Sequence, residues 1–156
     1  MGDDLGYKSG TMISREQLRR YVFPWQKKCV DLAHKHGKPF ILHSCGNLEK
    51  IMEALIEYVR IDVRHSFQDN ITPVTEAKKK YGDRIAILGG IDVDKLCRLP
   101  VDELRKYVAK TISECARDGE YALGSGNPIT NYMKIENYKA MLEVGLRLGK
   151  YPLRRR

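Results

Sequence analysis

Two spacings of apolar residues alternate along this chain. Short runs that are apolar, or that alternate apolar with polar residues, are typical of β-strands, and they occur at 39–44, 59–67, 84–88 and 120–124. Elsewhere apolar residues recur every three or four positions, which predicts helices over 14–37, 47–59, 72–82, 92–97, 102–116 and 134–148. The order is one helix and then strand–helix units repeated four times. Such alternation indicates right-handed β-α units and a parallel sheet.

The first predicted helix carries its own boundary signals. Ser14 and Gln17 form a capping-box pattern, and Gly37 suits the position after the last turn. Pro24 has no N–H to donate, so it should kink this helix or split it in two. The apolar residues that recur at helical spacing in it are Leu18, Tyr21, Val22, Trp25, Cys29, Leu32 and Ala33.

Two parallel architectures fit this order of elements. A doubly wound sheet suits a single domain over all 156 residues. A (β/α)8 barrel needs about 250 residues, so the chain would supply only half of one. A half-barrel would have two open edges and an uncovered inner face, and open edges pair readily with other chains. We therefore expect either a homo-oligomer or a missing N-terminal half.

Two local patterns add detail to this outline. The run at 84–88 ends in Gly89 and Gly90, as expected for a parallel strand that is covered on both faces. The glycine-containing segment 1–13 has the composition of a loop. It carries two adjacent carboxylates close to its start.

The overall composition excludes several classes of protein. No apolar run approaches the roughly 20 residues of a membrane span, and the acidic N-terminus does not resemble a signal peptide. The net charge of +8 is spread over helix faces apart from Arg154–Arg156, which favours solvated faces over a nucleic-acid surface. The four cysteines lie far apart, so we expect reduced thiols and a cytoplasmic protein. Cys97 and Cys115 fall on predicted helices as packing residues.

His43 and Cys45 end the first predicted strand and carry the clearest chemistry. Residues at i and i+2 of a strand share a face, so the imidazole and the thiol should point the same way. Together they suit a zinc-type ion. A buried cysteine beside a hydrogen-bonded histidine is the alternative interpretation, because two ligands do not make a site.

Function in parallel β/α proteins collects where the strands end. His65 follows the second strand and could be a third ligand or a general acid/base, or simply a hydrogen-bonded strand-end histidine. Asp3 and Asp4 could act as base, ligand or substrate anchor, or be solvated. The loops that follow the third and fourth strands contain glycines, which permit close approach of a ligand. The substrate-binding candidates in these loops are Gly90, Asp92, Ser125 and Asn127.

Four motifs in this order resemble the uroporphyrinogen decarboxylase superfamily: Gly2–Gly6, His43–Asn47, Ile87–Asp92 and Glu136–Asn137. That superfamily includes uroporphyrinogen decarboxylase itself and zinc-dependent methyltransferases that act on corrinoid-bound methyl groups. The resemblance spans nearly the whole chain. It implies a (β/α)8 barrel of which this chain is the C-terminal half.

The resemblance implies zinc-assisted methyl transfer between a corrinoid and a thiol. The methyltransferases bind zinc with His-x-Cys, matched by His43 and Cys45, and a later Cys that would fall near 124–126, where this chain has none. Asp3, Asp4, His65 or a group from another chain would complete the site. One alternative is metal-free decarboxylation of a tetrapyrrole, with arginines or lysines on its carboxylates. Another is a non-catalytic half-barrel that needs a partner half.

Overall fold

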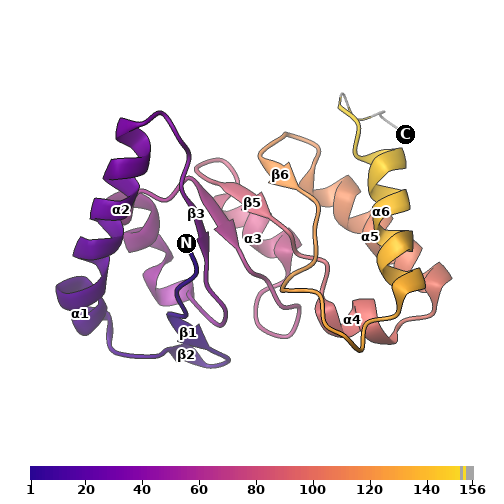
Figure 1. Cartoon of the computed structure of the whole chain (residues 1–156), viewed down its shortest axis with the longest axis horizontal. Coiled ribbons are helices and arrows are strands. Elements are labelled where there is room, and N and C mark those ends of the chain that lie inside the picture. Colours follow the sequence, from indigo (N-terminus) through magenta and orange to yellow (C-terminus); the bar gives the residue numbers. More distant parts are fainter. Residues whose placement is uncertain (152, 154–156) are drawn as a thin grey trace.

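Four parallel strands form the centre of the computed structural model, which describes residues 1–151 and 153 (Figure 1). The sheet order is β3-β4-β5-β6, so that each strand lies beside the next one in the chain. A doubly wound sheet would reverse its order at a switch point. The order instead is that of one half of a (β/α)8 barrel. The strands are β3 Ile41–His43, β4 Val63–His65, β5 Ala86–Leu88 and β6 Tyr121–Ala122.

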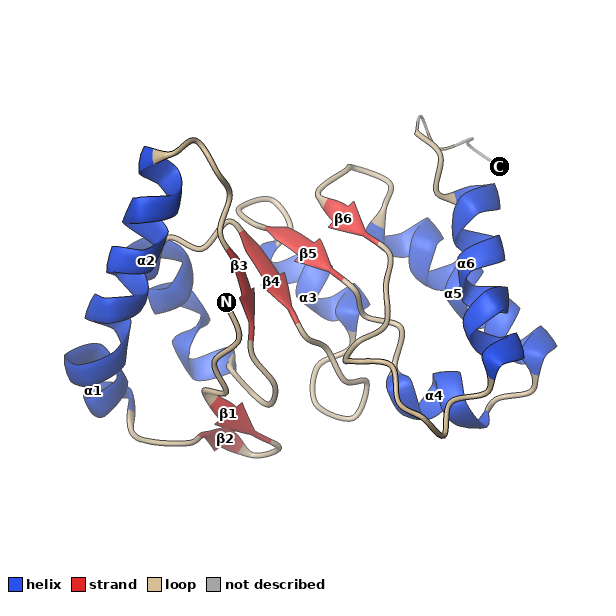
Figure 2. Cartoon of the chain, viewed as in Figure 1, coloured by secondary structure: helices blue, strands red, loops and turns tan. Residues whose placement is uncertain are grey.

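Helices follow the strands as the sequence predicts, and they pack along one side of the sheet (Figure 2). Pro100 precedes the helix that the sequence places at 102–116, and Asp92 caps the short helix before it by accepting a hydrogen bond from the Lys95 N–H. These helices are α3 Val74–Tyr81, α4 Val93–Arg98, α5 Val101–Cys115 and α6 Ile135–Leu148. Among the described residues, no helix has the length and apolar character of a membrane span.

The first predicted helix is split, as Pro24 requires. It consists of α1 Arg15–Gln17, a π-helical turn over Leu18–Val22, and α2 Phe23–Lys35. The capping box of Ser14 with Gln17 is present, and Gly37 ends the helix with φ +64°.

The π-helical turn also moves the buried face of α2 by one residue. A π-turn holds an additional residue, so every later side chain is rotated relative to a regular helix. Phe23, Gln26 and Val30 are buried, whereas Trp25 is 63% exposed and Leu32 is 59% exposed. The expected apolar face around Trp25 is therefore wrong by one position along the helix.

The segment predicted as a helix over 47–59 is wound irregularly. It consists of a 3-10 turn at Glu49–Ile51 and a π-helical turn at Ala54–Val59. Arg60 then takes a left-handed conformation with φ 69°, which ends the helix and delays the next strand to Val63. The Asn47 side chain accepts a hydrogen bond from the Glu49 N–H at 3.0 Å, as expected of a cap.

Only one face of the sheet is fully covered. Leu42, Arg64 and Ile87 point toward the helices and are buried. Their neighbours on the opposite face stay partly exposed, and Ile41 is 42% exposed. The expectation that the strand at 84–88 is covered on both faces is therefore wrong, since Ala86 and Leu88 face the inside of the barrel, which this half does not fill.

The first residues of the chain are more ordered than a loop. Met1 and Asp3 bond to β3 in parallel fashion, through the His43 N–H to the Met1 carbonyl at 2.8 Å and the Asp3 N–H to the His43 carbonyl at 3.0 Å. A short antiparallel hairpin follows, β1 Gly6–Tyr7 and β2 Gly10–Thr11. The sheet was expected to have two open edges, which are β3 and β6. The N-terminal residues cover part of β3, so that only the β6 edge is open among the described residues.

The four cysteines lie at separate places in the fold. All four cysteines are free. Cys115 is fully buried on α5, where burial raises the pKa of its thiol to about 11, and Cys97 packs at the edge of the core beneath α6. Both are packing residues.

The shifted face of α2 can be tested with two aromatic residues that are two positions apart. Phe23 is 0% exposed and Trp25 is 63% exposed. We expect Phe23→Ala to lower the free energy of unfolding by about 3–5 kcal/mol through the cavity it leaves. Trp25→Ala should cost less than about 1 kcal/mol, mainly its contact with Lys28. Urea denaturation followed by circular dichroism measures both, and equal losses would contradict the shift.

Candidate metal centre

The strand ends bring the predicted histidines together. In the parallel ladder His43 of β3 is the register partner of His65 of β4, so both side chains project on the inner face. Their rings lie with centroids 4.9 Å apart, and the two Nδ1 atoms are 2.7 Å apart. The Nε2 atom of His65 lies 3.0 Å from the backbone carbonyl oxygen of Ser125, which follows β6. The two imidazole rings thus connect the C-terminal ends of β3 and β4 with the loop that follows β6.

The carbonyl of Ser125 decides where the protons of both rings lie. A carbonyl oxygen only accepts, so Nε2 of His65 carries a hydrogen and donates it. In neutral His65 the Nδ1 atom then accepts, and the His43 Nδ1–H donates to it. His43 is left with its lone pair on Nε2, the nitrogen that faces Cys45 at 3.6 Å from Sγ. This chain of bonds leaves the lone pair of His43 Nε2 available to a metal ion or a proton.

The neutral form of His65 is also the favoured one. Burial is the largest cause and lowers the pKa of His65. The hydrogen bond to the Ser125 carbonyl opposes this by a smaller amount, and the nearby His43 adds to the lowering. His65 is therefore uncharged at neutral pH and suits an orienting role.

Cys45 lies at the centre of a small polar cluster. The side-chain amide of Asn127 donates to Sγ at 3.3 Å, and the hydroxyl of Ser66 lies 3.9 Å from it. The backbone N–H of Cys45 donates to Oδ1 of Asp4 at 3.3 Å. The thiol is therefore surrounded by groups from the chain start and from two strand exits.

Gly46 allows the Cys45 loop to lie against the hairpin. Its φ is +83°, and a Cβ atom there would come 2.2 Å from the backbone of Gly6. A side chain therefore cannot be placed at Gly46 without moving one of the two loops. The Asn47 N–H donates to the Tyr7 carbonyl at 2.8 Å and stabilises the same contact.

Asp4, His43 and Cys45 form a group that fits a metal ion. One ligand atom from each lies within 4.8 Å of those of the other two. An imidazole nitrogen, a thiolate and a carboxylate oxygen are the donors that zinc takes in proteins. Three protein ligands also leave one tetrahedral position for a substrate, the pattern of catalytic rather than structural zinc.

Two of the other predicted site residues, Asp3 and Asp92, use their carboxylates in hydrogen bonds outside this group. Oδ2 of Asp3 accepts a hydrogen bond at 2.7 Å from Gln26 on α2. Both carboxylate oxygens of Asp92 accept backbone N–H groups, from Lys95 at 3.1 Å and from Asp69 at 2.9 Å. The Asp3 carboxylate thus holds a side chain of α2, and that of Asp92 holds backbone N–H groups; neither belongs to the group of Asp4, His43 and Cys45.

Gly90 and Ser125 act through their backbones. A Cβ atom on Gly90 would lie 2.4 Å from Val74, so this glycine permits close packing of α3 against the loop. Ser125 contributes its carbonyl to His65, while its hydroxyl donates to the Asn127 carbonyl at 2.7 Å. Asn127 thus belongs to the polar cluster around Cys45, and Gly90 does not.

Two neighbours of the site were not singled out from sequence. Ser66 stands next to His65 in the same strand exit, and that adjacency was the available signal. Gln26 is a buried polar residue whose partner is Asp3, but the sequence places it one position from the expected apolar face of α2.

Comparison with known proteins agrees with this fold. The family model described as uroporphyrinogen decarboxylase (URO-D) matches residues 2–146. No protein of curated function matches the sequence. A methyltransferase from Methanosarcina mazei has a similar fold, with a TM-score of 0.74 and 18% sequence identity. The similarity covers 96% of this chain and 42% of the methyltransferase, so the chain spans less than half the length of that protein. The chain belongs to the uroporphyrinogen decarboxylase family.

Proposed function

We propose that this chain binds zinc through Asp4, His43 and Cys45 and serves methyl transfer from a corrinoid to a thiol. The observation that supports it most is the close grouping of three different donor atoms, all within 4.8 Å, at the rim of the strand ends. The fold shared with a methyltransferase points in the same direction. Asp4 takes the ligand position for which the sequence offers no further cysteine.

The chemistry follows from the roles of the surrounding residues. A bound zinc ion would supply Lewis acidity that lowers the pKa of a substrate thiol and stabilises its thiolate. His65 fixes the tautomer of His43, as outer hydrogen bonds commonly do for metal-binding histidines. The Asn127 amide donates to Cys45 and supports negative charge on its sulfur. The fourth ligand position would receive the thiol.

The partly exposed inner face supports a second part of the proposal. His43 and His65 lie on the face that a complete barrel would enclose, and the chain covers only 42% of the methyltransferase of similar fold. We propose that the corrinoid or other tetrapyrrole is bound only after a second set of strands completes this face. A second copy of the chain or a separate N-terminal half would supply it.

Zinc content tests the metal site directly. We expect protein purified without a histidine tag to hold about one zinc per chain. Cys45→Ser should lose most of it, because the serine hydroxyl is a poor zinc ligand. Cys29→Ser is the matched control, because Cys29 is an exposed thiol on α2. Plasma emission spectrometry measures the metal. Zinc-free wild-type protein that binds porphyrin would redirect the assignment to metal-free decarboxylation.

If His65 orients His43, its removal should weaken zinc binding without abolishing it. His65→Ala removes the acceptor that fixes the His43 tautomer but leaves all three proposed ligands. We expect zinc affinity to fall about 10–100-fold, as for other outer-sphere partners of metal ligands. His36→Ala is the control, since His36 lies at the end of α2. Competition with a chromophoric chelator reports the affinity, and an unchanged value for His65→Ala would exclude the role.

The need for a second half predicts assembly. At micromolar concentration we expect gel filtration to show a dimer or a larger oligomer, because an exposed inner face and an open β6 edge favour association. Methyl transfer should be absent in the chain alone when it is monomeric, and should appear on addition of an N-terminal half. A stable monomer with full activity would contradict this part of the proposal.

A further inference from the structure

Arg64 is a buried cation on the helix-facing side of β4. It is 3% exposed, and its register partners Leu42 and Ile87 are apolar. Because consecutive residues of a strand point to opposite faces, Arg64 lies on the other side of the sheet from His65. The guanidinium therefore lies on the opposite side of the sheet from the rings of His43 and His65.

The guanidinium has few partners for a buried charge. Its Nη1 donates to the sulfur of Met52 at 3.4 Å, a weak acceptor, and its Cζ lies 4.7 Å from the centre of the Phe67 ring. Nε has no hydrogen-bond partner among the described residues, and Arg64 takes part in none of the ion pairs found between them. Burial lowers the pKa of Arg64 to about 10, which still leaves it charged at neutral pH. An unpaired charge in such a place is costly to bury.

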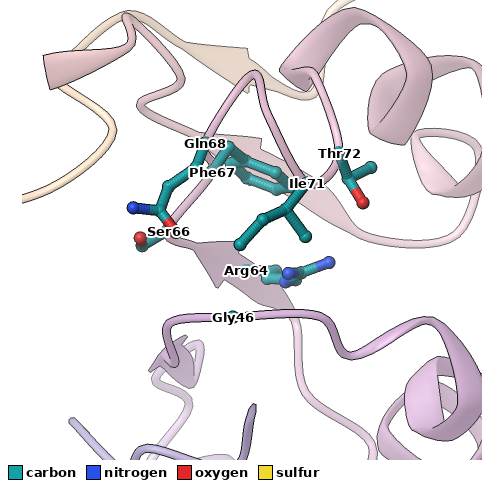
Figure 3. A pocket seen from close by; sticks show the side chains of 7 residues that line it. All are labelled: Gly46, Arg64, Ser66, Phe67, Gln68, Ile71 and Thr72. Carbon is teal, nitrogen blue, oxygen red and sulfur yellow. The ribbon is translucent and has the colours of Figure 1, made fainter. Parts of the chain in front are cut away.

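A cavity adjoins this guanidinium. Figure 3 shows Arg64 between the segment at Gly46 and the loop that follows β4. The volume is about 10 Å³, close to the roughly 10–15 Å³ that one enclosed water molecule requires. Polar side chains and apolar ones share the lining, which consists of Gly46, Arg64, Ser66, Phe67, Gln68, Ile71 and Thr72.

We propose that this cavity binds one small monovalent anion, of the size of chloride, against the Arg64 guanidinium. The cavity accommodates about one water-sized particle, which suits a single-atom anion better than a carboxylate or phosphate group. A water molecule would fit and accept from an N–H, but it would leave the positive charge without compensation. Ser66 and Thr72 also line the cavity, and a hydroxyl group is able to donate to an anion.

The position of the cavity gives the anion a structural consequence. Gly46 directly follows Cys45, and Ser66 directly follows His65, so the cavity lies between the loops that leave β3 and β4. An anion held there would link both loops to one buried cation. The proposal does not require zinc, because the charge to be neutralised is that of Arg64; Ser66 is shared, since it lines the cavity and also lies 3.9 Å from the Cys45 sulfur.

Chloride-35 NMR tests the proposal in solution. We expect the chloride line to broaden in the presence of the wild-type chain, and the broadening to be displaced by bromide in a saturable way. Arg64→Met keeps much of the side-chain volume and should abolish the saturable broadening. Arg98→Met removes the same charge from an exposed side chain on α4 and should leave the broadening unchanged. Circular dichroism establishes that each variant is folded.

Two outcomes would overturn the anion site. One is folded wild-type protein without saturable broadening, which would mean that water alone occupies the cavity. The other is broadening that survives in folded Arg64→Met, which would place the ion elsewhere. If Arg64→Met does not fold, crystals of the wild-type chain soaked in bromide decide the matter. An anomalous peak beside Arg64 supports the site, and its absence overturns it.

Discussion

The parallel pairing of β3 with β4, with His43 opposite His65, is the constraint on which the site depends. A shift of one residue in this register would turn one ring toward the helices and separate the two Nδ1 atoms that now lie 2.7 Å apart. The pairing also sets where the following loops begin. Cys45 and Ser66 then meet above the strand ends, within reach of Asn127 from β6. The geometry around the sulfur is thus a property of the sheet rather than of any single loop.

Much of this could be predicted from periodicity and spacing. The apolar runs indicated parallel strands in chain order, and the i, i+2 spacing placed His43 and Cys45 on one side. The strand exits were expected to gather polar groups, and the structure joins His65, Ser125 and Asn127 to Cys45 in this way. The different roles of the adjacent Asp3 and Asp4 could not be predicted from their spacing. Asp4 reaches the cluster while Asp3 turns to Gln26, because adjacent residues of an extended chain point in opposite directions.

Other features required backbone detail that residue patterns do not carry. The pairing of Met1 and Asp3 with β3 is made by backbone groups, which every sequence offers equally. Asp92 has both its oxygens bonded to backbone N–H groups, and a carboxylate at a helix start has the same sequence signature whether it caps or binds a substrate. Arg64 lies between the partly buried Val63 and His65, and an arginine in a strand more often faces solvent, so its burial became visible only with the helices in place.

The π-helical turn at Leu18–Val22 decides which of two aromatic side chains of α2 is buried. Phe23 is buried in the core, and Trp25 faces outward. If the same residues were wound as a regular α-helix at unchanged length, the later part of α2 would be rotated by about 100°, the angle of one residue. Trp25 would then turn toward the core, and Gln26 would swing away from Asp3. Loss of one residue within the turn would instead restore regular winding and keep Phe23 buried, because the turn accommodates the very residue that is lost.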